Sequence, residues 1–101
     1  MPDRLASLVA AARDGDRGAF EELVRATTAE TYTLALRLLG NEEDARDVAQ
    51  EVYLRAFRSI GRFRGDASFR TWLYRITANC AATSLGKRGR RFESGRRYRP
   101  M

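Results

Sequence analysis

Between residues 62 and 79, arginine and aromatic side chains alternate in a pattern that suits contact with single-stranded nucleic acid. The positively charged positions are Arg62, Arg64, Arg70 and Arg75. The aromatic positions are Phe63, Trp72 and Tyr74. Arginines can follow a phosphate backbone, and each aromatic face can stack an unpaired base for about 1–3 kcal/mol. Asn79 adds an amide that can read a base edge through a paired donor and acceptor.

The same residues also fit a purely structural role. Trp72 and Ile76 fall on the apolar stripe of a predicted helix, and Asn79 is compatible with an ordinary solvated position. Spacing alone therefore leaves base reading and core packing both open.

The available residue types disfavour an enzyme. The chain has no histidine and a single lysine, Lys87, whereas nucleophile–base pairs need a histidine or a well-placed lysine. The carboxylates between residues 42 and 47 lie at a helix start, where capping explains them more simply than acid–base catalysis. One cysteine, Cys80, and no histidine also disfavour a disulfide and a zinc site. We expect no catalytic residue, no metal and no cofactor.

Charge is divided unequally along the 101 residues. Residues 1–61 carry 8 basic and 11 acidic side chains, whereas residues 62–101 carry 11 basic and 2 acidic ones. The first part has a net charge of −3 and the second of +9, which together give the overall +6. Only the second part would attract a polyanion, so the charge split indicates two different partners.

Four amphipathic helices can place these residues. Apolar periodicity predicts helices over residues 5–13, 17–39, 42–59 and 68–85. Asp16 and Asn41 are expected to cap the second and third helices, and either Asp66 or Ser68 the fourth. Glycines at positions 40, 61 and 86 are expected to end the last three helices. The predicted fold is an all-α compact bundle of four helices, followed by a basic tail that is disordered when unbound.

The third predicted helix has a core face and an acidic face. Its apolar stripe comprises Ala45, Val48, Ala49, Val52, Tyr53, Ala56, Phe57 and Ile60. Its opposite face comprises Asp44, Asp47, Gln50, Glu51 and Leu54. Such a face can be a docking surface or merely a solvated one, and the residues alone leave both readings open.

Two long blocks then identify a family resemblance. They are residues 44–53 (DARDVAQEVY) and residues 63–66 with 71–79 (FRGD and TWLYRITAN). In this order and spacing, the chain from about residue 14 to residue 91 resembles region 2 of bacterial extracytoplasmic-function (ECF) sigma factors. The resemblance implies a region 2 domain over residues 1–91 and a linker or tail over 92–101. The second domain of a full ECF sigma factor, which reads the −35 element, is expected to be absent from this chain.

The resemblance also implies two partners. Asp44, Asp47, Gln50, Glu51 and Leu54 would dock on the β′ clamp helices of RNA polymerase. Phe63 and the loop through Ser68, with Ile76 and Asn79, would form a pocket for a base flipped from the non-template strand of the −10 element. The full expected DNA-binding set is Arg62, Phe63, Arg64, Gly65, Asp66, Ser68, Arg70, Trp72, Tyr74, Arg75, Ile76, Asn79, Lys87 and Arg88. Thr83 stands where many members have an aspartate, which bears on the −10 base preference.

Two other functions compete with this reading. The domain could serve as an interaction module bound by an anti-sigma factor, or as a generic basic bundle that binds nucleic acid without base selectivity. Because no signal peptide and no bilayer-spanning apolar run is recognisable, we expect a cytoplasmic protein without membrane insertion. A monomer is the default for the family.

Overall fold

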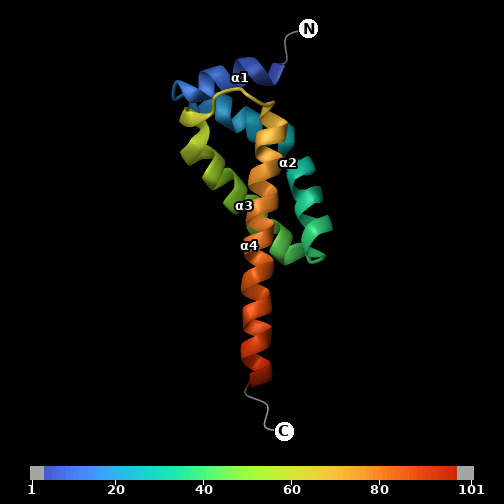
Figure 1. Ribbon diagram of the computed structural model, residues 1–101. Helices are drawn as coiled ribbons and strands as arrows, with labels where there is room; N and C mark the ends of the chain where they lie inside the picture. Colours follow the sequence, from blue (N-terminus) through green and yellow to red (C-terminus); the bar gives the residue numbers. More distant parts are fainter. Residues whose placement is uncertain (1–3, 98–101) are drawn as a thin grey trace.

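The computed structural model describes the backbone of residues 4–97 and the side chains of residues 4–87. Its elements are α1 (Arg4–Arg13), α2 (Arg17–Leu39), α3 (Glu42–Ser59), the short 3-10 helix η1 (Ile60–Arg62) and α4 (Phe69–Arg97). No strand occurs in the described part of the chain. The helices α1, α2 and α3 pack around the upper half of α4, and the lower half of α4 extends beyond them (Figure 1). The predicted all-α bundle of four helices is confirmed.

Short-range capping interactions define most helix ends. Asp16 accepts a hydrogen bond from the backbone N–H of Ala19 at 3.0 Å, and Asn41 accepts one from Asp44 at 2.9 Å. Gly40 ends α2 in the left-handed conformation, with φ of 69°. Ser68 accepts from the N–H of Thr71 at 3.1 Å, so Ser68 rather than Asp66 caps α4. The bounds predicted for α2 and α3 are confirmed.

Two of the predicted helix terminators are wrong. Helix α3 ends at Ser59, and Gly61 lies inside η1. Helix α4 runs through Gly86 to Arg97, so the tail predicted to be disordered from residue 87 is helical over that range. A glycine stops a helix when it turns left-handed, and Gly86 is not one of the described glycines with positive φ. A glycine inside a helix costs only about 0.5–1 kcal/mol, which the strong helix formers around it can offset. Residues 98–101 lie outside the described residues.

The core forms where the predicted apolar stripes meet. Where α2 meets α3, the largest fully buried side chains are Leu23, Thr27 and Val52. Helix α4 contributes the buried Leu73 and Cys80 to the same core. One residue assigned to the core stripe is misplaced. Phe57 is 47% exposed because it lies at the outer border of the stripe. Its ring contact with the core is an edge-on contact with Phe20.

Candidate nucleic-acid and protein interfaces

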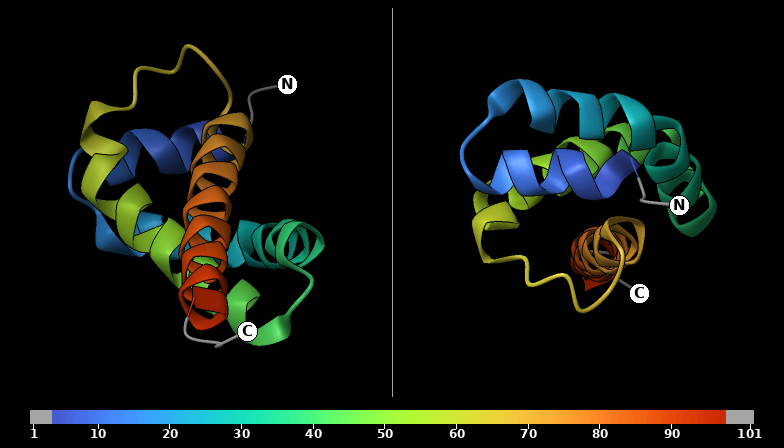
Figure 2. Two further views of the ribbon diagram at one scale, coloured as in Figure 1. Left: turned by 60° about the horizontal axis from the view of Figure 1, so that its bottom comes forward. Right: turned by 90° about the horizontal axis from the view of Figure 1, so that it is seen from above.

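The loop between η1 and α4 is held at both of its ends. Phe63 donates its backbone N–H to the carbonyl of Ile60 at 3.1 Å, and Ser68 caps the first turn of α4. Gly65 has a φ of 80°, a conformation that side-chain-bearing residues rarely adopt. Between these points the chain arches away from the helices (Figure 2). The sequence thus builds an exposed loop of defined shape.

Phe63 anchors this loop to α4. Its ring lies 5.0 Å from the ring of Trp72 and 6.5 Å from that of Phe69, measured between centroids. Phe63 is 8% exposed, so most of its surface is already covered. Its established contacts are structural, and little of its ring is left as a face for stacking a base.

A hollow of about 430 Å³ opens between the loop and α1. Its loop side is lined by Phe63, Gly65, Asp66, Ala67, Ser68 and Phe69. Its other side is lined by Ala6, Val9, Ala10 and Arg13 of α1. The loop residues of the predicted base pocket therefore share a cavity, with α1 as the facing wall. Sequence reasoning missed α1, since nothing in the spacing of residues 4–13 links them to residues 63–68.

The helical members of the predicted pocket lie elsewhere on α4. Trp72, Ile76 and Asn79 follow one another at helical spacing along one face, with Trp72 and Ile76 partly buried and Asn79 exposed. Trp72 meets Phe63, but Ile76 and Asn79 do not line the hollow beside α1. The structure divides the predicted pocket into a loop part and a helix part.

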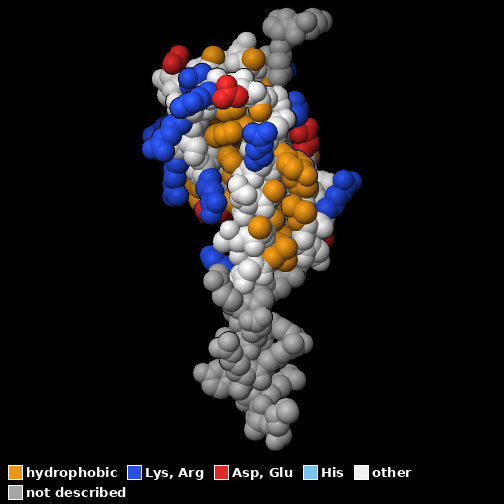
Figure 3. All heavy atoms as spheres, in the orientation of Figure 1, with side chains coloured by type: hydrophobic (Ala, Val, Ile, Leu, Met, Phe, Trp, Pro, Cys, Tyr) orange, Lys and Arg blue, Asp and Glu red, His pale blue; other side chains and the backbone are white. Residues whose placement is uncertain are grey.

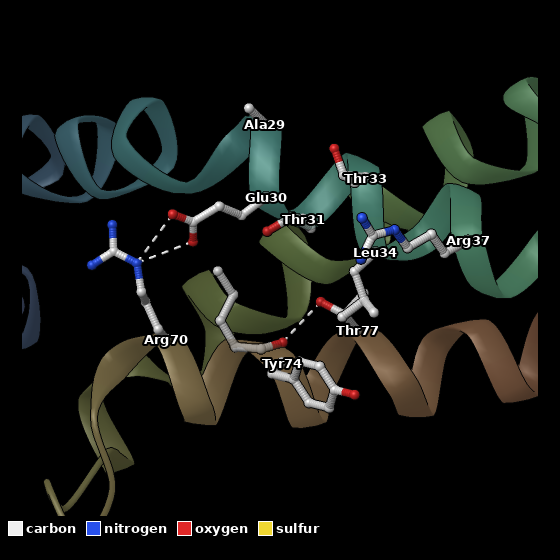
Figure 4. A pocket seen from close by; sticks show the side chains of 10 residues that line it. Ala29, Glu30, Thr31, Thr33, Leu34, Arg37, Arg70, Tyr74 and Thr77 are labelled. Carbon is white, nitrogen blue, oxygen red and sulfur yellow. Dashed lines mark hydrogen bonds and ion pairs between the residues drawn. The ribbon is translucent and has the colours of Figure 1, made fainter.

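Arg70 and Tyr74 occupy a different edge of α4, facing α2. Arg70 Nε lies 3.0 Å and 3.2 Å from the two carboxylate oxygens of Glu30, and Tyr74 is 57% exposed (Figure 4). Both line a groove of about 510 Å³ together with Leu34 and Arg37 of α2. Apolar side chains gather beside α4 in this region (Figure 3). Two residues of the predicted DNA-binding set are thus separated from the loop hollow.

The remaining cations of the predicted DNA-binding set are solvent-exposed. They are Arg62, Arg64, Arg75 and Lys87. Lysine and arginine side chains gather on the side of the molecule that carries η1 and the loop (Figure 3). The side chain of Arg88 lies outside the described residues.

The predicted docking face of α3 has two edges. Gln50 and Leu54 line a groove of about 600 Å³ with Phe57 and, from α2, Arg17 and Phe20. A separate hollow of about 290 Å³ against α4 is lined by Asp47, Glu51, Arg55, Cys80 and Lys87, among others. Glu51 pairs with Arg55 at 3.1 Å, and Asp44 is partly buried at the start of the helix.

Phe57 is the residue of this face that sequence reasoning missed. It is 47% exposed and Leu54 is 51% exposed, which makes the groove between α2 and α3 the apolar part of the face. The ring of Phe57 packs edge-on against Phe20, with centroids 5.2 Å apart. The signal was its position three residues after Leu54, which places both on neighbouring parts of the helix surface.

Cys80 is a buried thiol at the contact of α3 and α4. Burial raises its pKa, and the nearby Arg55 guanidinium only partly opposes this. A thiol in this state reacts slowly, because the thiolate is the nucleophile. Among residues with described side chains, no cluster of three acidic, histidine or cysteine residues could hold a metal ion. No helix between residues 4 and 97 has the length and apolar character that crossing a membrane requires.

Comparisons with known proteins agree on one family. Residues 23–91 match the family model described as sigma-70 region 2. The RNA polymerase sigma-H factor of Pseudomonas aeruginosa is 44% identical over 84 residues, which are 83% of this chain and 44% of that protein. This chain therefore spans less than half the length of that relative.

Two solved structures share the fold. An engineered region 2 of sigmaE, in an NMR structure of its complex with GTAAAA, superposes with a TM-score of 0.82 at 35% identity. The match covers 92% of this chain and 99% of that one. CnrH, in complex with the cytosolic domain of CnrY, superposes with a TM-score of 0.76 at 30% identity, covering 93% and 62%. The family resemblance inferred from the two sequence blocks is confirmed: the chain belongs to the sigma-70 region 2 family, as a region 2 domain of the ECF type.

Proposed function

We propose that this domain binds RNA polymerase through α3 and captures single-stranded −10 promoter DNA through the loop at residues 63–68 and α4. The observation that carries the proposal is the loop itself. It is exposed, anchored by Phe63, open to a hollow, and placed at the start of the most basic helix of the chain. The relative solved with GTAAAA supports a nucleic-acid ligand at this type of domain.

Capture of a base would promote promoter opening without any covalent step. Extruding one base from a duplex costs a few kcal/mol, so the receiving site must offset that cost. A loop whose ends are fixed by Phe63 and Ser68 is already ordered, and binding would lose little further conformational entropy. Because the site would bind the open strand better than the closed duplex, it would shift the equilibrium towards the open promoter.

Polymerase would dock on the outer face of α3. The groove lined by Gln50, Leu54 and Phe57 offers apolar contact, and Asp47 and Glu51 lie on the neighbouring edge. An apolar centre with a charged border is the usual composition of a protein interface. The β′ clamp helices are the expected partner of this face.

We further propose that the domain acts in the cytoplasm and, like sigma factors generally, is an initiation factor and not an enzyme.

Fluorescence anisotropy with labelled oligonucleotides tests DNA capture. Single strands varied base by base across a −10-like element are compared with their duplexes at one moderate salt concentration. We expect a preference for single strand, concentrated at one or two positions and weakened in Asn79→Ala. Thr28→Ala, an exposed position on α2, serves as the control. Equal binding of all sequences and of duplex would refute base capture and favour a generic basic bundle, because phosphate contacts are blind to sequence.

Charge reversal tests the docking face. We expect Asp47→Lys combined with Glu51→Lys to abolish binding to polymerase core while leaving oligonucleotide binding intact. Unchanged affinity for polymerase would remove the docking assignment. Since CnrH was solved with the cytosolic domain of another protein, an anti-sigma partner that masks this domain is the second candidate function. Competition between such a partner and polymerase core for the isolated domain would favour it.

A further inference from the structure

Helix α1 presents two different stripes to the rest of the molecule. Leu5, Val9 and Ala12 are buried in the core. Ala6, Ala10 and Arg13 lie at the next helical positions and line the hollow opposite the loop. Packing of the first stripe on α2 and η1 therefore fixes where the second stripe stands relative to residues 63–69.

The hollow offers both apolar and polar groups to a ligand. Val9, Phe63 and Phe69 form its apolar floor and are themselves almost fully buried, whereas the exposed Arg13, Asp66 and Ser68 supply polar groups. Its volume of about 430 Å³ lies within the range of about 300–1,000 Å³ found for small-molecule pockets. The lining is polar and apolar in similar measure. A base, which has flat apolar faces and a hydrogen-bonding edge, can contact both kinds of surface.

Small side chains keep the α1 side of the hollow open. Ala6 and Ala10 line the hollow and are exposed. A longer side chain at either position would therefore extend into that space. Arg13 stands one turn further on and is exposed. The ion pairs found among the described side chains join Glu51 to Arg55 and Glu30 to Arg70, so Arg13 takes part in neither. A guanidinium so placed can bind a phosphate through two parallel hydrogen bonds.

We infer that α1 is the second wall of the base pocket, in which Ala6 and Ala10 set the space for the extruded base and Arg13 holds its phosphate. The inference rests on the proposed base capture and deepens it. It assigns the base to the hollow between α1 and the loop. The face of α4 that carries Ile76 and Asn79 would then contact neighbouring nucleotides.

Filling the hollow from the α1 side tests the wall. Ala10→Leu is compared with Ser7→Leu, which adds the same bulk to an exposed α1 position that does not line the hollow. We expect Ala10→Leu to weaken binding of the preferred single strand about tenfold or more, the loss expected when one stacked base is excluded. Ser7→Leu should bind like the parent. Thermal unfolding of both variants checks that the fold is intact.

An abasic series locates the effect. Each base of the preferred strand is replaced in turn by an abasic site, and the parent should lose affinity at one extruded position. In Ala10→Leu that position should no longer matter, because the base is already excluded. A loss that persists at the same position would overturn the assignment of the base to this hollow.

Arg13→Gln tests the phosphate contact independently of cavity size. We expect the slope of log affinity against log salt to fall by about one in Arg13→Gln and to stay unchanged in Arg4→Gln, another exposed α1 arginine. Equal slopes would remove the role of Arg13. If the parent itself shows no sequence dependence, base capture fails as a whole. A different result would refute the α1 wall alone. In that case the parent is sequence-selective and Asn79→Ala binds the preferred strand more weakly, but Ala10→Leu binds it like the parent.

Discussion

The hydroxyl of Tyr53 lies 2.8 Å from Oγ1 of Thr27, and the same hydroxyl lies 2.9 Å from Oγ1 of Thr31. Thr27 also donates its single hydroxyl hydrogen to the carbonyl of Leu23 at 2.7 Å. Thr27 must then accept from Tyr53, and Tyr53 must accept from Thr31. The hydrogen bonds therefore run in one direction, from Thr31 through Tyr53 and Thr27 to Leu23. This chain joins α2 to α3 behind the groove that Leu54 and Phe57 line.

Removal of the Tyr53 hydroxyl should destabilise the fold. Tyr53→Phe takes the acceptor from Thr31 and the donor from Thr27, both of which are buried. We expect the free energy of unfolding to fall by about 1–3 kcal/mol, measured by urea titration with an unchanged slope. Tyr74→Phe is the control, because Tyr74 is 57% exposed and should lose almost nothing. If the two substitutions lower the free energy of unfolding equally, the hydrogen bonds of the Tyr53 hydroxyl do not contribute to stability as proposed.

The apolar groove on α3 should contribute to polymerase binding more than to stability. Leu54 is half exposed, so Leu54→Ser should change the unfolding temperature little. If Leu54 is one of the few residues that carry the binding energy of the interface, its truncation costs about 1 kcal/mol or more, so we expect the affinity for polymerase core to fall about fivefold or more. Leu38→Ser, at an α2 residue that is 43% exposed and does not line this groove, is the matched control. The groove has no docking role if Leu54→Ser and Leu38→Ser bind polymerase equally well.

The ion pair of Arg70 with Glu30 should matter little for stability. Both side chains are about half exposed, and pairs of this kind contribute less than about 1 kcal/mol. Arg70→Gln should therefore unfold within about 1 kcal/mol of the parent. If Arg70 binds a DNA phosphate, the same variant should lower the slope of log affinity against log salt by about one. An unchanged slope would assign Arg70 to the contact of α2 with α4 only.

Gly86 offers a direct test of where α4 ends. A Cβ added at Gly86 would meet nothing within 4 Å, and its backbone is helical. Gly86→Ala should then raise stability by up to about 1 kcal/mol and increase helicity measured by circular dichroism. Gly40→Ala is the contrasting variant, because Gly40 has a φ of 69° and should lose stability. A loss of helicity in Gly86→Ala would instead indicate a left-handed helix end.

Cys80 should make stability depend on alkaline pH. Because burial raises its pKa in the folded protein, the unfolded chain loses this proton first as pH rises past the thiol's ordinary value of 9.0. The free energy of unfolding should therefore fall as pH rises through that range, and the thiol's contribution should be complete below it. Cys80→Ala should show a shallower decline. Iodoacetamide at pH 8 should modify the native thiol slowly and the urea-unfolded thiol quickly.

Local chemistry explains why α2 and α3 were predictable to the residue. Each of these helices begins where a cap side chain accepts a hydrogen bond from the backbone N–H three residues later. Helix α2 ends where Gly40 adopts the left-handed conformation. Such interactions depend on neighbours in sequence, so they can be inferred from residue types alone. The same holds for the apolar stripes, whose periods follow from helix geometry.

Contacts between distant segments decided the rest. A stripe does not reveal which of its borders meets another helix, and Phe57 turned out to face solvent while Trp72 packs on Phe63. Residue spacing on α4 placed Arg70, Tyr74 and Asn79 on one helix, but only the packing of α2 against it puts Arg70 and Tyr74 on a separate edge. Likewise, α1 faces the loop because its buried stripe packs on α2 and η1, although residues 4–13 and residues 63–68 lie far apart in the chain. The sequence by itself determined the helices, the family, the acidic face of α3 and the basic, aromatic segment of residues 62–79. These depend on which residues follow one another in the chain. The tertiary structure decided which side chains share a cavity, because that depends on packing between helices far apart in the chain.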